Sequence, residues 1–344
     1  MSQPLRTRSL AELGVAPADV IDTAVVVQIP MRVRFRGLTH REATLIRGPQ
    51  GWAEFSPFPE YADVEASRWL RSAVESAWGG WPTAVRAVVP VNATLPAVSA
   101  DQVPGILDRF PGCRTVKIKV AEPGQSLRDD IERVAAARDY LGSAGKIRVD
   151  ANGGWDVGAA LVAIAKLNQW DLEYAEQPVL EVADLAQLRV LLAHRGISVP
   201  IAADESIRKA EDPFLVAKLE AADLIVVKVA PLGGVRSALD IVAQVGLPAV
   251  VSSAIDTSVG LAAGVALAAA LPDLPYACGL GTAALLDGDV VANSLLPREG
   301  NLTLERASHA IHSVSLNDVD QWRAEPARQD WWKSRLERCV SLIT

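Results

Sequence analysis

The fold of this chain is decided by five short stretches between residues 115 and 228: TVKIK (115–119), RVD (148–150), YAE (174–176), AAD (202–204) and VVK (226–228). Apolar residues in and around each stretch suit a buried strand, yet each stretch also carries a charged side chain. Asp150, Glu176, Asp204 and Lys228 recur at intervals of roughly 25 residues, about the length of one strand, one helix and two loops. The spacing predicts successive βα units with one charge in each.

Strand-like runs continue on both sides of this region. Eight of them are expected to be strands: RAVVPVNA (86–93), TVKIKV (115–120), KIRVDAN (146–152), EYAEQP (173–178), VPIAADES (199–206), LIVVKVA (224–230), PAVVSS (248–253) and YACGL (276–280). Segments with apolar residues at three- and four-residue spacing separate them, as in helices. Parallel strands need helical crossovers, and eight such strands close a barrel. We predict an α/β fold, a (β/α)7β TIM-like barrel, because no clear eighth helix follows the last strand.

A different pattern precedes the barrel. Residues 22–30, 40–48 and 51–55 predict antiparallel strands, with a loop at MRVRFRGL (31–38) between the first two. A helical stretch over residues 63–81 ends at Pro82. We expect an α+β capping domain made of the N-terminal segment and the C-terminal tail. The expected boundaries are 1–84 for the N-terminal part, 85–299 for the catalytic barrel and 300–344 for the tail.

The composition is that of an ordinary folded enzyme. The 344 residues are 50% hydrophobic, and the net charge of −7 argues against nucleic acid or an anionic membrane surface as a partner. Cys113, Cys278 and Cys339 match neither a disulfide framework nor a CxxC metal site. The N-terminus does not read as a signal peptide, and residues 261–271 are too short to span a bilayer. We expect a cytoplasmic protein; the sequence does not predict an oligomeric state.

Lys117 and Lys119 lie two residues apart on one predicted strand, so both side chains point to the same side. Neighbouring ammonium groups lower each other's pKa, and burial lowers it further. A lysine in this setting is a candidate general base at neutral pH. The alternative is a strand whose lysines face solvent.

Asp150, Glu176 and Asp204 end three successive predicted strands. Hard divalent cations prefer carboxylate oxygens, which predicts a site for Mg²⁺, with Mn²⁺ as a substitute. No histidine or cysteine shares these strand ends, which argues against zinc. For any one of these acids, capping a helix is the alternative, and Asp204 is placed to do so.

Further candidates follow on the later strands. Lys228 ends the strand after Asp204 and is expected to approach the site from the side opposite Lys119. Ser252, Ser253 and Gly279 lie at the mouth of the predicted barrel, where they could bind a substrate carboxylate. Turn geometry alone would also explain the glycine.

Together these motifs resemble a known family. KxK, DxN, EQP, DES and a later lysine, in this order and preceded by GWAEF, resemble the muconate-lactonising subgroup of the enolase superfamily over nearly the whole chain. Within the subgroup, the resemblance is strongest to members that dehydrate 2-succinyl-6-hydroxy-2,4-cyclohexadiene-1-carboxylate in menaquinone biosynthesis. It rests on four segments: PMRVRFRG (30–37), GWAEFSPFPEY (51–61), VVKVAPLGG (226–234) and SSAIDTSVGL (252–261).

The resemblance implies a role for each candidate. Lys119 would remove the proton α to the substrate carboxylate and then protonate the departing hydroxyl, a syn elimination, while Lys117 tunes it. Lys228 would stabilise the intermediate, in a superfamily that uses a lysine or histidine base with a Mg²⁺-stabilised ene-diolate. Arg32 and Phe35 would contact the succinyl tail. Asp150, Glu176 and Asp204 would hold the metal.

Two alternatives stay open. Racemases of N-acylamino acids and epimerases of dipeptides use the same constellation, with two opposed lysines exchanging protons. Those isomerases commonly carry DxD after the last lysine, whereas this chain reads SSAIDTS with a single Asp256 and no close partner. That favours dehydration. A non-catalytic relative is disfavoured because no key residue has been replaced.

Overall fold

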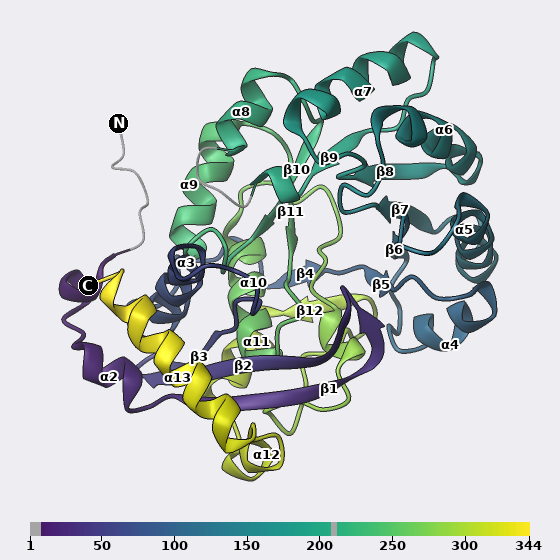
Figure 1. The fold of residues 1–344 in the computed structure, drawn as a ribbon. Coiled ribbons are helices and arrows are strands. Elements are labelled where there is room, and N and C mark those ends of the chain that lie inside the picture. Colours follow the sequence, from purple (N-terminus) through teal and green to yellow (C-terminus); the bar gives the residue numbers. More distant parts are fainter. Residues whose placement is uncertain (1–7, 208–211) are drawn as a thin grey trace.

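The computed structural model describes residues 8–207 and 212–344, in which a barrel lies beside a smaller antiparallel sheet (Figure 1). The parts of the predicted domains that fall on residues 1–7 and 208–211 lie outside the described residues. Parallel strands form the barrel sheet in the order β11-β10-β9-β8-β7-β6-β5. They are β5 (Ala93–Leu95), β6 (Thr115–Lys119), β7 (Lys146–Asp150), β8 (Leu172–Glu176), β9 (Ile201–Ala203), β10 (Leu224–Lys228) and β11 (Ala249–Ser252).

Residues 278 and 279 close the barrel between its two edge strands. Gly279 forms a parallel bridge with Ser252 of β11, and Cys278 forms one with Val91, just ahead of β5. The Gly279 amide donates to the Val251 carbonyl at 2.8 Å. YACGL therefore occupies the eighth strand position, and the predicted (β/α)7β barrel is confirmed.

The first predicted strand, residues 86–93, is wrong as a single barrel strand. Its first half forms β4 (Val88–Pro90), which pairs antiparallel with β12 (Asn301–Thr303) outside the barrel sheet. The barrel strand β5 begins only at Ala93. The second half of the run does reach the barrel, because the Pro90 carbonyl accepts the Cys278 amide at 2.8 Å and the Asn92 amide donates to the Cys278 carbonyl at 2.9 Å.

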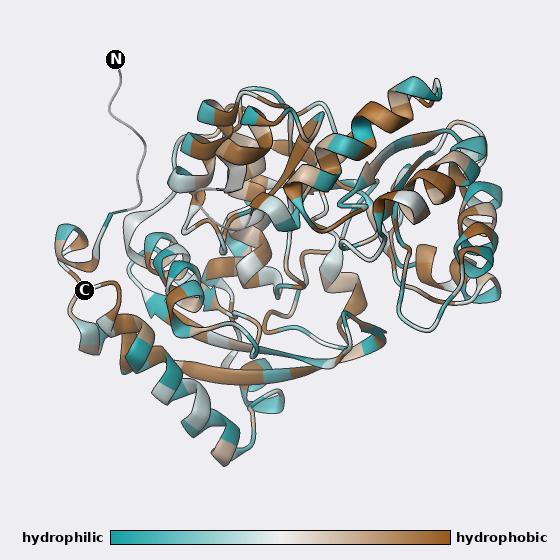
Figure 2. Cartoon of the chain, turned by 45° about the horizontal axis from the view of Figure 1, so that its top comes forward, coloured by the Kyte–Doolittle hydropathy of each residue, from teal (hydrophilic) through white to brown (hydrophobic). Residues whose placement is uncertain are grey.

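Helices cover the outside of the barrel (Figure 1). They are α4 (Val103–Leu107), α5 (Leu127–Leu141), α6 (Val157–Leu167), α7 (Val182–His194), α8 (Asp212–Lys218), α9 (Val235–Val245) and α10 (Ser258–Ala270). Short 3-10 turns supplement them at η2 (Ala100–Gln102), η3 (Asn168–Trp170), η4 (Glu205–Ile207) and η5 (Thr282–Leu285). Figure 2 shows apolar residues concentrated on the strands and mixed polar character on the outer helices. Helix α10 is apolar after Ser258 and almost entirely buried, and α11 (Leu304–His312) packs on it.

The antiparallel sheet consists of β1 (Val25–Phe35), β2 (Leu38–Gly48) and β3 (Gly51–Phe55). The predicted loop at residues 31–38 is wrong, because β1 stays extended to Phe35 and pairs there with Leu38. Arg36 and Gly37 turn the chain with φ of 51° and 76°. Positive φ at both central residues is the geometry of the tight hairpin turn that matches strand twist. This hairpin carries Phe35 and Arg36 toward the barrel mouth.

The remaining helices pack beside this sheet (Figure 1). They are α1 (Leu10–Leu13), α2 (Pro17–Ile21), α3 (Asp63–Val74) with its π-helical extension η1 (Glu75–Gly79), α12 (Leu316–Gln321) and α13 (Pro326–Ser341). Helix α13 packs on α3 and α2, and its Trp332 ring meets the Phe55 ring edge-on at 6.0 Å. The N-terminal and C-terminal parts of the chain therefore share one apolar core. The exact domain boundaries stay predictions.

Candidate active site

The predicted charged residues meet at the carboxyl ends of neighbouring barrel strands. In the strand register, Lys119 of β6 lies opposite Asp150 of β7, and Asp150 lies opposite Glu176 of β8. On the other side of the barrel, Lys228 of β10 lies opposite Ser252 of β11. Parallel strands bring these side chains to one mouth although they are far apart in sequence.

Lys117 forms a buried ion-pair cluster with two of the carboxylates. Its Nζ donates to Asp150 Oδ2 at 2.9 Å and to Glu176 Oε1 at 2.6 Å. Burial alone would lower the pKa of Lys117, but the two carboxylates outweigh it and raise that pKa well above its usual value. The expectation that a neighbouring lysine and burial depress the pKa is therefore wrong for Lys117.

Lys119 lies between a carboxylate and an amide. Its Nζ donates to Asp150 Oδ2 at 2.6 Å and also to Asn152 Oδ1. Asn152 follows β7 in a left-handed conformation, φ 46°, which asparagine tolerates better than most residues. The Phe35 ring centroid lies 5.4 Å from the Lys119 Nζ. Asn152 was not among the predicted site residues, although the DxN spacing pointed to it.

The three carboxylates are buried, and the pKa values of Glu176 and Asp150 are shifted in opposite directions. Burial, followed by the charge of Asp150, raises the pKa of Glu176 to about 8. For Asp150, Lys117 and Lys119 overcome burial and hold the pKa well below its usual range. Lys228 Nζ donates to both carboxylate oxygens of Asp204. Lysine Nζ atoms thus form hydrogen bonds with all three carboxylates of this cluster.

One observation shows that these residues fit a metal ion. Glu176 Oε2 is buried without a hydrogen-bond partner, a costly state for a carboxylate oxygen unless a proton or cation reaches it. Carboxylate oxygens are also the ligands that hard divalent cations prefer. Within residues 8–207 and 212–344, however, no three acidic, histidine or cysteine side chains are already grouped around a common metal position. Instead, the carboxylates accept hydrogen bonds from Lys117, Lys119 and Lys228.

Gln177 of the EQP motif positions Asp204 and was missed by the sequence reasoning. It is buried with φ 37°, and its Oε1 accepts the Asp204 amide at 2.9 Å. Its Nε2 donates to Ser206 Oγ at 2.9 Å. The side chain therefore ties the end of β8 to the turn that carries Asp204.

Most of the predicted site residues line one cavity. It is lined by Phe35, Arg36, Phe58, Thr94, Lys117, Lys119, Asp150, Asn152, Asp204, Glu205, Lys228, Ser252, Ser253, Ala254, Ile255, Gly279 and Thr282. Ser253 Oγ donates to the Gly279 carbonyl at 2.8 Å, so these two predicted substrate-binding residues are in contact. Three aromatic or cationic groups at the mouth, Phe35, Arg36 and Phe58, come from the antiparallel sheet and the loop after it.

Arg32 is not brought to this cavity. Its Nε donates to the Leu286 carbonyl at 2.8 Å, and its Nη1 lies 3.6 Å from Asp287 Oδ1. Arg36 lines the cavity in its place, with its guanidinium 4.5 Å from the Phe58 ring centroid. The hairpin turn at Arg36 and Gly37, which the sequence reasoning took as part of a longer loop, decides which arginine faces the site.

Comparison with known proteins decides the family. The model of enolase C-terminal domain-like proteins matches residues 107–308, and that of enolase N-terminal domain-like proteins matches residues 26–77. The o-succinylbenzoate synthase of Mycobacterium tuberculosis is 52% identical over 325 residues, 94% of this chain and 95% of the relative. That of Thermobifida fusca is 53% identical over 307 residues, 88% of this chain and 95% of the relative.

The chain belongs to the o-succinylbenzoate synthase family of the enolase superfamily. This confirms the predicted superfamily, and with it the prediction of an enzyme of the lyase class. Solved structures of other enzymes share the fold of this o-succinylbenzoate synthase family member. Muconate lactonizing enzyme from Pseudomonas fluorescens superposes with a TM-score of 0.74 at 22% identity, covering 88% of this chain and 98% of that structure.

A second solved structure, the L-Ala-D/L-Glu epimerase from Bacillus subtilis, has a TM-score of 0.69 at 23% identity. It covers 81% of this chain and 94% of its own. At such identities the likeness concerns the fold alone. Within the part of the chain that the structure describes, no helix is both long and apolar enough to cross a membrane.

Proposed function

We propose that this chain catalyses the Mg²⁺-dependent syn dehydration of 2-succinyl-6-hydroxy-2,4-cyclohexadiene-1-carboxylate to 2-succinylbenzoate. The observation that carries the proposal is one cavity lined jointly by Lys119, Lys228 and the carboxylates of Asp150 and Asp204. Family membership at more than 50% identity supports the same reaction. The substrate is a small carboxylate, for which a cavity of bases and cations is suited.

Lys119 is the proposed base. As the neutral amine, its Nζ takes the proton α to the substrate carboxylate, and the resulting ammonium then gives a proton to the hydroxyl, which departs as water from the same face of the ring. The Asp150 and Asn152 oxygens that accept from Nζ hold it in place for both transfers. One group can serve twice because the elimination is syn.

Asp150, Glu176 and Asp204 would hold Mg²⁺, with Mn²⁺ as a substitute, and the metal supplies positive charge that offsets the charge developing on the substrate carboxylate. Lys117 Nζ donates to both Asp150 and Glu176 and so orients these two carboxylates and offsets their mutual repulsion. Lys228 lines the same cavity as Lys119, and we propose that it supplies a cation against the ring of the bound substrate. Ser252, Ser253, Gly279 and Phe35 are proposed to border the bound substrate. Arg32 stays a sequence prediction for this role.

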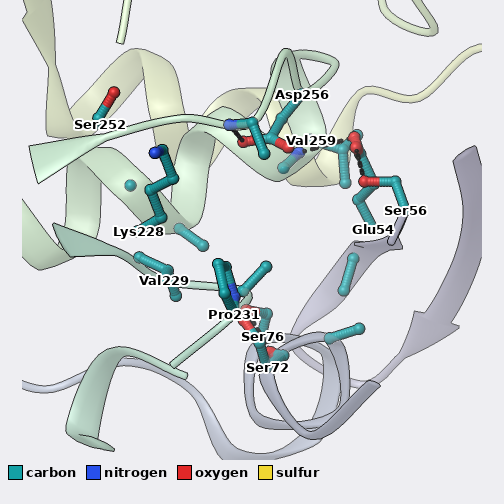
Figure 3. Close-up of a pocket in the computed structure, with 17 residues that line it drawn as sticks. Glu54, Ser56, Ser72, Ser76, Lys228, Val229, Pro231, Ser252, Asp256 and Val259 are labelled. Carbon is teal, nitrogen blue, oxygen red and sulfur yellow. Dashed lines mark hydrogen bonds between the residues drawn. The ribbon is translucent and has the colours of Figure 1, made fainter. Parts of the chain in front are cut away.

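Asp256 favours dehydration over the racemase or epimerase alternative. It lines a neighbouring cavity, together with Glu54 and Ser56, and not the cavity that holds Lys119 (Figure 3). Its Oδ2 accepts the Ala254 amide at 3.1 Å, and its Oδ1 lies 4.0 Å from Arg41 Nη2. A carboxylate engaged in this way is not placed to bind an α-ammonium group.

The experiment is a substrate comparison under metal control. Purified protein is incubated with the cyclohexadiene carboxylate and, separately, with an N-succinyl amino acid, and each product is followed by NMR. We expect 2-succinylbenzoate only when Mg²⁺ or Mn²⁺ is present, and its loss on chelation. Efficient racemisation of the amino acid without dehydration would establish the alternative function. Cytoplasmic location and the exclusion of nucleic-acid and membrane partners stay predictions.

A further inference from the structure

The segment that joins β11 to α10 borders the catalytic cavity on one side and the antiparallel sheet on the other. Ser253, Ala254 and Ile255 line the cavity that holds Lys119 and Lys228. Ile255 has φ 62°, the left-handed region that a β-branched side chain strongly disfavours. Such a conformation persists only where surrounding contacts hold it.

Arg41 of β2 makes the decisive contact. Its side chain is 1% exposed, and its Nε donates to the Ile255 carbonyl at 3.0 Å. Its Nη2 donates to Ser56 Oγ at 2.9 Å, and its guanidinium lies 4.8 Å from the Phe58 ring centroid. A buried guanidinium with these partners has a fixed position, because its planar fork leaves little freedom. Arg41 therefore fixes the Ile255 carbonyl to the antiparallel sheet.

Glu54 of β3 holds the next part of the same segment. Its Oε2 accepts the amides of Thr257 at 3.0 Å and Gly260 at 3.2 Å. These amides belong to the start of α10, where backbone N–H groups have no partner within the helix. Ser56 Oγ donates to the other oxygen, Glu54 Oε1, at 2.6 Å. Glu54 thus caps α10 from a different part of the chain.

Glu54 and Asp256 are the two carboxylates at this segment, and both lie close to Gly260 (Figure 3). A Cβ on Gly260 would lie 2.7 Å from the Asp256 Cβ and 2.9 Å from Glu54 Oε2, so only glycine fits there. Burial and the charge of Asp256 raise the pKa of Glu54 to about 7, although Arg41 opposes the shift. Asp256 Oδ1 also lies 4.0 Å from Arg41 Nη2, so removing the guanidinium would leave buried acids without their compensating charge.

We propose that Arg41 and Glu54 are positioning residues, which hold Ile255 and the start of α10 in the shape that the catalytic cavity needs to bind its substrate. Neither side chain lines the cavity that contains Lys119, so both act through the segment and not on the substrate. The proposal rests on the dehydratase function proposed above and assigns part of its substrate binding to the antiparallel sheet.

The first test is a double-mutant cycle on Arg41 and Ile255. Arg41→Gln is expected to lower kcat/KM of dehydration about 10- to 100-fold, mainly through KM, because the cavity wall is displaced. Glycine adopts positive φ freely, so the same change should cost less than about threefold in an Ile255→Gly background. Arg47→Gln, at an exposed position on the same strand, is the matched control and should match the wild type. An equal loss in both backgrounds, or an unchanged KM in Arg41→Gln, would overturn the proposal.

The second test needs no substrate. Hydrogen exchange of peptides covering residues 254–261 should be faster in Arg41→Gln and in Glu54→Gln than in the wild type, while peptides covering residues 146–150 exchange as before. Unchanged exchange at residues 254–261 in both variants would overturn the proposal. Faster exchange in all peptides of Arg41→Gln would mean that this variant unfolds globally. In that case the exchange of residues 254–261 in Glu54→Gln, which keeps the shape of the side chain, tests the proposal. A wild-type protein that fails to dehydrate its substrate would refute the proposed function and leave this exchange result intact.

Discussion

Lys119 and Asp150 lie opposite each other on neighbouring barrel strands, and the Lys119 Nζ donates to Asp150 Oδ2 at 2.6 Å. The contact joins the proposed base to a proposed metal ligand. Lys117 Nζ donates to the same oxygen at 2.9 Å. A change in the charge of Asp150 therefore alters the surroundings of both lysines, and the two functions of the site are coupled.

Asp204→Asn should separate metal binding from folding. The variant removes one negative charge from the three carboxylates, so we expect Mg²⁺ affinity to fall at least about 10-fold and dehydration to fall with it. Isothermal titration calorimetry with MgCl₂ measures the affinity, and thermal unfolding confirms that the fold is kept. Asp139→Asn, at an exposed position on α5, is the control. Wild-type affinity and turnover in Asp204→Asn would rule out this carboxylate as a ligand.

Lys228→Arg tests whether Lys228 acts as a cation or as a base. Arginine keeps the positive charge but does not deprotonate in proteins, so a residue needed only for charge tolerates the change better than a base does. We expect measurable 2-succinylbenzoate formation and no racemisation of N-succinyl amino acids, both followed by NMR. If Lys228→Arg still racemises N-succinyl amino acids, the scheme in which two lysines exchange protons is wrong, because arginine cannot act as the second base.

Arg36→Gln should raise the KM for the carboxylate substrate, because Arg36 lines the catalytic cavity. Loss of a charge-assisted hydrogen bond costs about 1.5–3 kcal/mol, which corresponds to a KM increase of roughly 10- to 100-fold. Arg32→Gln provides the comparison, since Arg32 donates to the Leu286 carbonyl outside the cavity. Steady-state kinetics of both variants show which of the two arginines contributes to substrate binding. A larger KM effect from Arg32→Gln would restore the sequence-based assignment.

Glu54→Gln should change how stability depends on pH. The pKa of Glu54 is raised to about 7 in the folded chain, from 4.5 without the fold. Between these values the folded chain holds a proton that the unfolded chain has lost, so this group lowers the free energy of unfolding as pH rises. Its contribution reaches about 3 kcal/mol near pH 7.

Glutamine does not titrate, so the variant should gain stability relative to the wild type from about pH 4.5 to about pH 7 and gain no more above that. Urea unfolding of both proteins across this range measures the difference. A difference that is constant with pH would show that Glu54 keeps no proton in the folded chain.

The barrel and most of its site could be predicted because the relevant signals are local. Apolar runs with a charge at their end mark strands whose ends meet, whatever the loops between them do. Lys119, Asp150 and Lys228 were identified in this way, and the structure brings them to one cavity. Residues 276–280 were also predicted correctly as the last strand position, from their short apolar run.

Contacts between distant segments could not be predicted in the same way. Arg41, Glu54 and Asp256 come together from two β-strands and a loop about 200 residues further on, and no spacing rule links them. The raised pKa of Lys117 depends on which carboxylates reach its Nζ, and a strand pattern does not specify this. The choice of Arg36 over Arg32 depends on one turn, at Arg36 and Gly37.

The most direct test of the central claim, that Lys119 moves the proton, is Lys119→Met assayed in deuterated solvent. Product formation and deuterium exchange into recovered substrate are both followed by NMR, with Lys166→Met at an exposed position as the control. We predict that Lys119→Met loses both activities by about 10²- to 10⁴-fold or more, while the control keeps them. Deuterium exchange at the wild-type rate in Lys119→Met would contradict the account and place the base elsewhere in the cavity.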